Sequence, residues 1–424
     1  MQSLNPADIC FSISRNLLDA RYLNEASQWD PATLAHGYPG LLCLFAELNH
    51  FYPSKEWEDA QDLCVRRLFD AIQKNGIYDS SLFLGTAGIC FALDLASPPL
   101  LERIHSQFLS EIEQNYLAPL QETLGKKEGT PPRLYDLISG LCGFFPYLLR
   151  HASREDTLPL LKKMTAALVD LTHPLTIQGR QVPGWFIPSS FANEGETPFF
   201  GILDTGLAHG IAGVLTVLSK ACIKNVQVPG LKKAIGTIVE WLQNMRRTIK
   251  SFERVWPSRF SLEKIPDGFR EHSEYSYRDG WCYGAPGIAA ALFIAAHALK
   301  DFSLYDYALA AMNDLCVRLQ NQPTLKCPTM CHGYAGALAA VHQFYLATKD
   351  PFYREASERL AGQILAGYDP AAVFGFKSLA PQADGTEKNT DSPSLLGGST
   401  GVVLSLLFAE STEPRPWLEM FLLG

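Results

Sequence analysis

Two cysteines and a histidine stand at positions where they could bind one metal ion. Cys282 lies in the run Trp281-Cys-Tyr-Gly, and the pair Cys331-His332 precedes another glycine. Both cysteines lie two residues before the first glycine of a Gly-x-x-Gly motif. Two thiolates and an imidazole are a good donor set for zinc, and three protein ligands leave the fourth tetrahedral position open, as in catalytic sites. The alternative is that these cysteines are small buried apolar side chains.

A second histidine and an aspartate could carry out acid–base chemistry. His209 directly precedes the glycine of another copy of the motif, as His332 does, and Asp136 lies just before the preceding copy. A carboxylate beside an imidazole fixes the tautomer and raises the basicity of the ring. His209 is therefore a candidate general acid or base, with Asp136 as its partner. A hydrogen-bonded core histidine is the alternative.

Further polar residues near these positions have less specific signals. Arg278 could stabilise a developing negative charge, or it could be an exposed loop arginine. Tyr283 shares the position directly before the glycine and could orient a substrate or pack. His36 has the same position, but its repeat does not adjoin those of the other candidates. Cys327 could replace a metal ligand, but it has no counterpart in the preceding repeat, which favours a packing role.

The elements that must position these residues belong to a repeat, in which a Gly-x-x-Gly motif is followed by an apolar run. The first glycines of its seven copies are Gly37, Gly85, Gly140, Gly210, Gly284, Gly333 and Gly398. Recurrence at intervals of 48 to 74 residues predicts units that each bury an apolar face against their neighbours. Because neighbouring repeats are neighbours in space, Cys282, Cys331 and His332 are expected to converge.

Two kinds of segment alternate within the repeats. Apolar, alanine-rich segments follow the glycines and are expected to form inner helices, for example 40–48, 89–96, 214–218, 288–298 and 335–346. Amphipathic segments lie between them and are expected to form outer helices, namely 56–73, 101–116, 154–171, 231–246, 305–319 and 351–364. We therefore predict an all-α fold, a closed α/α toroid of seven helical hairpins with the glycine motifs around one mouth.

The length of 424 residues would suggest two or three domains, but the linked repeats favour a single domain over 1–424. Two insertions, 174–201 and 252–280, carry proline, glycine and aromatic residues in strand-like patterns. We expect them to extend over the mouth and to pair as a small sheet. Long surface loops are the alternative.

Composition excludes several classes of protein. The net charge of −8 leaves no basic stripe to neutralise phosphates, so no nucleic-acid partner is expected. The N-terminus lacks the basic and apolar regions of a signal peptide. Ten cysteines in such a chain indicate a reducing compartment and free thiols rather than disulfides. The uncharged stretch 280–299 contains an apolar run, 288–296, that is too short to cross a bilayer.

Taken together, these motifs resemble the LanC-type lanthionine cyclases, also called lantibiotic cyclases. The resemblance rests on Trp281-Cys-Tyr-Gly-Ala-Pro-Gly287, Cys331-His-Gly333, Ala208-His-Gly210 and the sevenfold repeat, and it spans Ala35 to Leu406. It implies a seven-repeat α-toroid that binds one Zn²⁺ per chain. It also implies a stand-alone cyclase, similar to those of the nisin and subtilin pathways. Gly37 comes so soon after the start that we expect no fused dehydratase domain.

The resemblance implies roles for individual residues. The family's zinc ligands fall on Cys282, Cys331 and His332. The catalytic histidine, its acidic partner, and the arginine and tyrosine near the metal fall on His209, Asp136, Arg278 and Tyr283.

The implied reaction adds a cysteine thiol of a dehydrated precursor peptide to a dehydroalanine or dehydrobutyrine of the same peptide, and the product is a lanthionine or methyllanthionine ring. Zinc would deprotonate the thiol. His209, as imidazolium, is expected to protonate the enolate at the α-carbon, and removal of the thiol proton by His209 is the alternative. The implied partners are a LanB-type dehydratase and a membrane ABC transporter. The expected location is cytoplasmic, with membrane association through these partners.

Three other functions fit parts of the sequence. Eukaryotic LanC-like proteins keep the zinc site and bind glutathione, so a thiol-binding or regulatory module is one alternative. Protein prenyltransferases are zinc–thiolate enzymes on a toroid, but they use an aspartate ligand, and none lies near Cys331. An inactive scaffold of a modification complex fits poorly with an intact set of metal ligands.

Overall fold

The computed structural model describes residues 5–26, 29–96, 105–191, 201–249, 252–265, 268–272, 277–321, 324–381 and 387–424. The chain divides into two compact units. Unit 1 consists of Met1–Glu102, Asp279–Trp281 and Leu319–Gly424, and unit 2 consists of Arg103–Arg278 and Cys282–Arg318.

A buried helix follows each of the seven glycine motifs, as predicted. In unit 1 these helices are α3 (Tyr38–Phe51), α5 (Thr86–Ala96), α14 (Tyr334–Thr348) and α16 (Ser399–Ala409). In unit 2 they are α8 (Phe145–Arg150), α10 (Ile211–Ile223) and α12 (Ala285–Leu299). They are apolar on nearly all sides, which is typical of helices in the centre of a large protein. Before α8 lies the 3₁₀ turn η4 (Leu141–Phe144), and Pro146 stands in the first turn of α8, where a missing N–H is tolerated.

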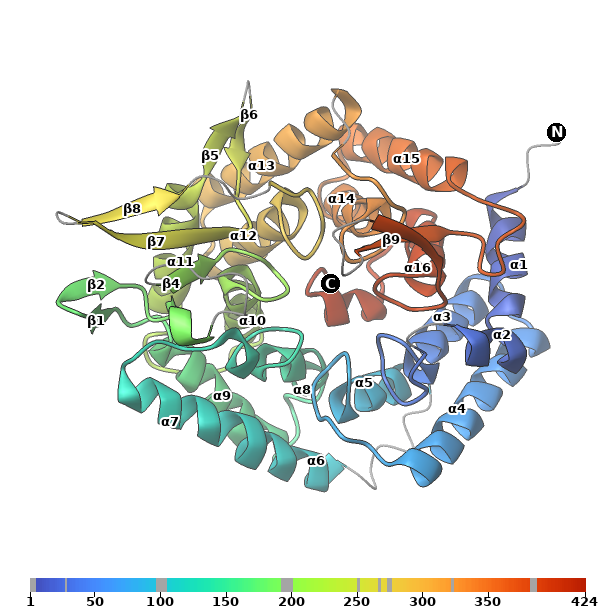
Figure 1. Ribbon diagram of the computed structural model, residues 1–424, viewed down its shortest axis with the longest axis horizontal. Coiled ribbons are helices and arrows are strands. Elements are labelled where there is room, and N and C mark those ends of the chain that lie inside the picture. Colours follow the sequence, from blue (N-terminus) through green and yellow to red (C-terminus); the bar gives the residue numbers. More distant parts are fainter. Residues whose placement is uncertain are drawn as a thin grey trace. The chain divides into compact units, whose positions relative to one another are not determined.

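The predicted amphipathic helices are also present. Unit 1 contains α4 (Lys55–Asn75) and α15 (Pro351–Ala366), which pack along α3 and α14 (Figure 1). Unit 2 contains α6 (His105–Ile112), α7 (Ala118–Lys126), α9 (Thr157–Asp170) and α11 (Leu231–Met245), and α13 (Phe302–Asn321) lies mainly in this unit. The π turn η2 (Glu113–Leu117) joins α6 to α7, so this helical segment extends beyond the expected end at residue 116. Residues 101–104 lie outside the described residues.

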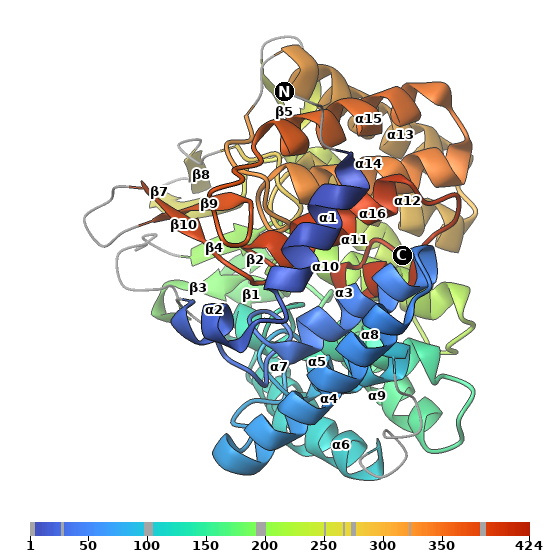
Figure 2. The ribbon, with the colours of Figure 1, turned by 90° about the vertical axis from the view of Figure 1, so that its right-hand side faces the viewer.

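The N-terminal helix α1 (Pro6–Asn16) was not predicted, although it belongs to the same plan. In unit 1 it packs against α16 (Figure 2), so it covers the buried helix of the last repeat. The short helix α2 (Ala20–Glu25) follows it. A helix from the start of the chain thereby packs on the seventh repeat, at the end of the chain.

Backbone hydrogen bonds link the segments that precede the glycine motifs. In unit 2 the N–H groups of Leu137 and Leu207 donate to the carbonyls of Ala208 (3.0 Å) and Cys282 (2.9 Å). In unit 1 the bonds run from Cys331 to Leu396 (2.9 Å), from Leu395 to Ala35 (2.8 Å) and from Ala35 to Phe83 (2.9 Å). The bond between Leu395 and Ala35 joins the seventh repeat to the first. Inside unit 1, the first and last repeats are therefore adjacent.

The second glycine of the motif permits close contact between repeats. A Cβ atom on Gly336 would lie 2.8 Å from Cβ of Trp281, and one on Gly88 would lie 2.6 Å from Cβ of Leu34. Both pairs lie inside unit 1. Since real side-chain carbons do not approach so closely, any larger residue would push the helix away from the preceding repeat.

Small sheets occupy the two insertions, and part of each belongs to one sheet in unit 2. The strands are β1 (Leu175–Ile177), β2 (Arg180–Val182), β3 (Ile187–Pro188), β4 (Gly201–Asp204), β5 (Arg247–Ile249), β6 (Phe252–Val255), β7 (Arg259–Ile265) and β8 (Gly268–His272). The four-stranded sheet has the order β3-β4-β7-β8, and β4 pairs with β7 in antiparallel register. The predicted pairing of the insertions is confirmed, and their position over the mouth stays a prediction.

One β-hairpin was not anticipated. In unit 1, β9 (Lys377–Pro381) pairs with β10 (Glu387–Asp391) between α15 and α16. Its second strand, Glu-Lys-Asn-Thr-Asp, has no alternation of apolar and polar residues, so it lacks the pattern that identifies a half-buried strand. The 3₁₀ turn η6 (Pro416–Phe421) follows α16.

Two predictions about bulk properties can be compared with the structure. All ten cysteines lie in the described part of the chain, and all are free thiols. Among the described residues, no helix has both the length and the apolar character that a membrane crossing needs.

Candidate active site

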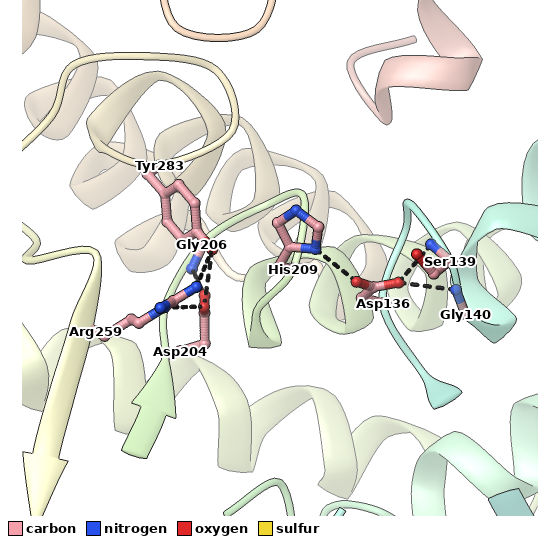
Figure 3. A network of polar contacts seen from close by, with 8 residues as sticks. All are labelled: Asp136, Ser139, Gly140, Asp204, Gly206, His209, Arg259 and Tyr283. Atoms are coloured by element: carbon pink, nitrogen blue, oxygen red, sulfur yellow. Dashed lines mark hydrogen bonds and ion pairs between the residues drawn. The ribbon is translucent and has the colours of Figure 1, made fainter. Parts of the chain in front are cut away.

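His209 and Asp136 form a hydrogen-bonded pair in unit 2 (Figure 3). His209 lies in the loop that leads into α10, and its Nδ1–H donates to Asp136 Oδ2 at 2.6 Å. Asp136 Oδ1 accepts hydrogen bonds from the backbone N–H groups of Ser139 (2.7 Å) and Gly140 (2.8 Å). The Asp136 side chain is 2% exposed and that of His209 is 39% exposed. The carboxylate is thus fixed by its own loop, while the imidazole stays accessible.

The local sequence explains how this loop holds the carboxylate. Gly140 is needed there because a Cβ atom would lie 2.5 Å from the backbone nitrogens of Tyr135 and Asp136. The loop is tied to the next repeat, since Leu137 N–H donates to the carbonyl of Ala208, the residue before His209. The same turns that begin the buried helices therefore bring the two side chains together.

The electrostatic surroundings favour the charged form of His209. Burial lowers its pKa, but the hydrogen bond and charge of Asp136, with the charges of Asp204 and Cys282, outweigh burial and raise the pKa above its usual value. His209 Nε2 has no hydrogen-bond partner among the described residues. Because Nδ1–H is held by the carboxylate, Nε2 is the ring atom that can give or take a proton.

A second polar network lies beside this pair and contains two residues that the sequence analysis missed, Asp204 and Arg259 (Figure 3). Asp204 ends β4, Arg259 begins β7, and the two are register partners. Asp204 Oδ2 accepts hydrogen bonds from Arg259 Nε (3.1 Å) and from the Tyr283 hydroxyl (3.0 Å). Arg259 Nη2 donates to the Tyr283 oxygen at 3.3 Å. The Tyr283 and His209 rings stack, with centroids 6.2 Å apart and planes inclined by 30°.

This network fixes Tyr283 rather than leaving it free to react. Burial raises the pKa of Tyr283 well above its usual value, and the charge of Asp204 adds to this effect. Burial also raises the pKa of Asp204, although Arg259 and the N–H of Gly206 oppose it. The phenol therefore stays protonated and donates to the carboxylate. The pairing of Asp204 with Arg259 depends on the register of β4 with β7, which the sequence pattern did not give.

The structure places Cys282 beside the residues that carry His209. Cys282 is buried, and its carbonyl accepts hydrogen bonds from the N–H groups of Leu207 (2.9 Å) and Ala208 (3.3 Å). The alignment of repeats predicted this proximity inside unit 2. Arg278 is exposed, and its predicted role near a metal stays a prediction.

In unit 1, Cys331 is half-buried and His332 is exposed. The buried Cys327 thiol hydrogen-bonds to the His332 side chain, and its Sγ lies 3.2 Å from Thr329 Oγ1. Burial raises the pKa of Cys327, but these two hydrogen bonds outweigh burial and lower it. Cys327 thus contacts a predicted metal ligand, which the sequence analysis did not expect. Across the described ranges, no three His, Cys, Asp or Glu side chains are grouped to hold a metal ion, and the ligand set stays a prediction.

A cavity of about 330 Å³ in unit 2 connects the two polar networks. His209, Asp136 and Ser139 line one part of it, and Asp204 and Arg259 line another. The remaining wall consists of Pro131, Pro132, Arg133, Ile187, Phe191 and Ile202. Its volume is at the lower end of the range for ligand sites in proteins, roughly 300–1,000 Å³. The accessible His209 ring therefore faces a space that can take a small group or a peptide side chain.

Comparison with known proteins gives the relationships of the chain. The model of the lanthionine synthetase C-like proteins matches residues 28–422. The chain belongs to the lanthionine synthetase C-like family. The nisin biosynthesis protein NisC of Lactococcus lactis subsp. lactis is 26% identical over 352 residues, which is 81% of this chain and 82% of that protein. A solved structure of nisin cyclase matches with a TM-score of 0.74 at 23% identity and covers 99% of this chain and 96% of that one. The predicted fold class is thereby confirmed.

In this lanthionine synthetase C-like chain, unit 2 offers three chemical capacities. The Asp136–His209 pair can move a proton at Nε2. Tyr283, held by Asp204 and Arg259, presents a fixed ring beside the imidazole. The buried Cys282 sulfur lies close enough that its thiolate form would raise the pKa of His209. This arrangement of His209, Tyr283 and Cys282 suits a reaction in which His209 transfers a proton close to a sulfur atom.

Proposed function

We propose that this chain is a zinc-dependent peptide cyclase that forms lanthionine and methyllanthionine rings in class I lantibiotic biosynthesis. The observation that carries the proposal is the Asp136–His209 pair, which faces a cavity in a chain of the lanthionine synthetase C-like family. The substrate would be a dehydrated precursor peptide. Its cysteine S–H adds across the Cα=Cβ bond of a dehydroalanine or dehydrobutyrine. Sulfur bonds to the β-carbon, the α-carbon gains a proton, and no group leaves.

His209 would act in the second half of this addition. As sulfur attacks the β-carbon, negative charge develops on the enolate of the dehydro residue. The surroundings of His209 raise its pKa and so favour the protonated ring, and Nε2–H can deliver its proton to the α-carbon. Asp136 holds the ring by Nδ1 and balances its charge, and Tyr283 restricts the ring from the side. Removal of the thiol proton by the neutral ring is the alternative role for His209.

The zinc ion would be held by Cys282, Cys331 and His332, and this donor set fits zinc chemically because it combines two soft thiolates with an imidazole. Within unit 1, Gly280 packs so closely that a Cβ atom on it would lie 2.8 Å from Cα of His332. Trp281 packs in the same way against Gly336. Cys282 is the next residue along the chain. These contacts support the proposed convergence of the ligands, and the ion would supply a deprotonated, nucleophilic thiol.

The zinc proposal is tested by metal content. We expect close to one zinc per purified wild-type chain and almost none in Cys282→Ala and Cys331→Ala. Cys222→Ala serves as the control, because Cys222 is a half-buried thiol in α10 that the proposal does not use. Retention of zinc by both ligand variants would contradict the ligand set.

The catalytic proposal is tested with a dehydrated precursor peptide. Cyclisation consumes the free thiol without changing the mass of the peptide, so thiol labelling and mass spectrometry together identify it. His209→Asn should keep the zinc yet lose ring formation. Normal cyclisation by this variant would remove His209 from the mechanism. Binding of glutathione without any cyclisation would instead favour the thiol-binding module.

We also propose that the chain works in the cytoplasm and joins a LanB-type dehydratase and an ABC transporter at the membrane. The ten free thiols support a reducing compartment. Co-precipitation of this chain with the tagged dehydratase from producing cells is the expected result. Loss of the chain from that complex under mild conditions would contradict the association.

A further inference from the structure

Part of the cavity wall beside the polar networks is apolar, and it belongs to the sheet and its flanking turn. Ile187 of β3 and Ile202 of β4 are cross-strand partners, so their side chains lie on the same face of the sheet. Both are less than 10% exposed. Phe191, in the turn after β3, lines the same cavity but is 41% exposed. A phenyl ring that is exposed beside a cavity offers apolar surface to a ligand.

Prolines complete this wall, and the loop that carries them is fastened to the sheet. Thr130 N–H donates to the carbonyl of Phe186 at 2.9 Å. Gly129 has a φ of +101° and lies so close to Pro188 that a Cβ atom would be 2.6 Å from the proline ring. Pro131 and the half-buried Pro132 follow directly and line the cavity. A preformed wall lowers the ordering cost when a ligand binds.

Among the described residues, some of the basic side chains that line the cavity are paired with a carboxylate, and one is not. Arg259 is committed to Asp204 and Tyr283, and His209 to Asp136. Arg133 also lines the cavity, is exposed, and has no hydrogen bond or ion pair with any described residue. Its guanidinium is therefore available to an acceptor oxygen. Since every peptide has main-chain carbonyls, such a donor can hold a peptide whatever its side chains are.

We infer that this cavity is the subsite for an apolar side chain next to the reacting cysteine of the precursor, with Arg133 bonded to a neighbouring main-chain carbonyl. The inference rests on the proposed cyclase function, because it names the part of the substrate that the site selects. The apolar side chain would pack on Phe191, Ile187 and Ile202. The two carboxylates that line the cavity would disfavour an acidic side chain.

The test uses short peptides that carry dehydroalanine and cysteine. The first series is acetyl-dehydroalanine-Ala-X-Cys-Ala-amide, and the second is acetyl-dehydroalanine-Ala-Ala-Cys-X-amide, with X as Ala, Leu or Asp. Rates are corrected for cyclisation without the protein. In one of the series, we expect kcat/KM for X = Leu to exceed that for Ala by about tenfold, in line with the selectivity of apolar pockets, and Asp to be worst. Equal rates in both series would overturn the subsite.

Two variants separate the apolar contact from the carbonyl contact. Phe191→Ala should lower kcat/KM for the Leu peptide much more than for the Ala peptide and so remove most of the preference, and Phe191→Leu should restore part of it. Arg133→Gln should raise KM about tenfold for all three peptides with kcat nearly unchanged, and Arg133→Lys should recover part of the loss. Lys162→Gln, an exposed lysine of α9, is the control. If Arg133→Gln raised KM only for the Asp peptide, Arg133 would bind the side-chain carboxylate of that peptide and not a main-chain carbonyl. The inference would then be wrong.

Binding of unreactive peptides separates failure of the subsite from failure of the proposed function. In these analogues alanine replaces dehydroalanine and serine replaces cysteine, and calorimetry measures their affinity for the full chain. A Leu preference that depends on Phe191 supports the subsite even if no peptide cyclises, in which case the cyclase proposal alone fails. Normal cyclisation with no dependence on X or on Phe191 leaves the cyclase proposal intact and overturns the subsite.

Discussion

The two nitrogens of His209 have different surroundings, and this difference determines how the residue should respond to pH. Nδ1 is held by Asp136, whereas Nε2 meets no partner among the described residues and the ring lines the cavity. The charges that face the ring are those of Asp136, Asp204 and Cys282. Removing the carboxylate at 136 should therefore change both the titration of the ring and its orientation.

We predict that Asp136→Asn lowers the pKa of His209, because burial then acts without the opposing charge and ionic hydrogen bond. An NMR titration of the histidine rings measures this shift. In the wild type the raised pKa lies above that of an unfolded histidine, about 6.5. The pair therefore stabilises the fold fully below that pH, and its contribution is lost as pH rises through the folded-state pKa. If His209 acts as imidazolium, the rate of cyclisation should decline as pH rises through the same window. In Asp136→Asn this decline should occur at lower pH.

The same titration contains its control. His105 is held by Tyr147 and Thr157 in another part of unit 2, so its signal should not move in Asp136→Asn. An unchanged pKa of His209 in the variant would mean that the hydrogen bond to Asp136 does not govern its protonation.

Sequence reasoning found some residues of this site and missed others for a physical reason. His209, Asp136 and Cys282 were identified because repeats place equivalent positions side by side. Arg259 comes from an insertion strand that has no counterpart in the other repeats. Asp204 lies six residues before Gly210, as Asp79 lies before Gly85, so the repeat covers its position but does not identify its partner. Their approach depends on the register of two strands that lie far apart in the chain, which local patterns do not encode.

At the scale of elements, the second glycines of three motifs in unit 1, Gly88, Gly336 and Gly401, set how closely a buried helix approaches the preceding repeat. This makes a matched pair of substitutions informative in unit 1. Gly336 begins α14 against Trp281 and the carbonyl of Met330, whereas Gly362 lies within α15 with open space around its Cα. Both positions are helical, but only Gly336 has neighbouring atoms that an added carbon would meet.

We predict that Gly336→Ala destabilises the protein by about 1–3 kcal/mol or more, because the added carbon forces neighbouring backbone apart. Gly362→Ala should instead stabilise it by about 0.5–1 kcal/mol through helix propensity. Urea unfolding of both variants measures the difference. Equal effects of the two substitutions would show that helix propensity, and not close contact between repeats, decides the outcome at Gly336.

Helices were more predictable than the other elements because their signals are local. The glycine motif marks the start of every buried helix, and helical spacing of apolar residues marks the amphipathic helices. The hairpin β9–β10 and the helix α1 lacked such signals. The hairpin has no alternation of apolar and polar residues in its second strand. Helix α1 precedes Gly37, the start of the first motif, so the repeat gives no reason to expect this helix.

At the scale of the whole chain, its two ends are held together inside unit 1. The bond from Leu395 to Ala35 joins the last repeat to the first. Arg415 adds an ion pair with Glu47 of α3, with Nε at 2.9 Å and Nη2 at 3.2 Å from the two carboxylate oxygens. Both side chains are less than 10% exposed. The closed ring of repeats predicted that the first and last repeats adjoin. The glycine motif gave no sign of the buried pair of Arg415 and Glu47.

The segment after Arg415 contacts Trp281, the residue before the proposed metal ligand Cys282. The indole N–H of Trp281 donates to the carbonyl of Phe421 at 2.8 Å, and the two rings meet edge to face at 5.0 Å. Trp281 directly precedes Cys282. Residues from the middle and the end of the chain therefore meet in one buried cluster in unit 1.

We predict that Arg415→Met destabilises the protein by about 3–5 kcal/mol, because the Glu47 carboxylate is left buried without a counter-charge. The double variant Glu47→Gln with Arg415→Met should regain most of this loss, since the replacement side chains carry no charge. Urea unfolding of the two single variants and the double variant measures the coupling. Because Arg415 anchors the segment that holds Trp281, the zinc ion that we propose should also dissociate faster from Arg415→Met than from the wild type. Equal destabilisation in the single and double variants would mean that packing of Arg415, and not its charge, joins the ends of the chain.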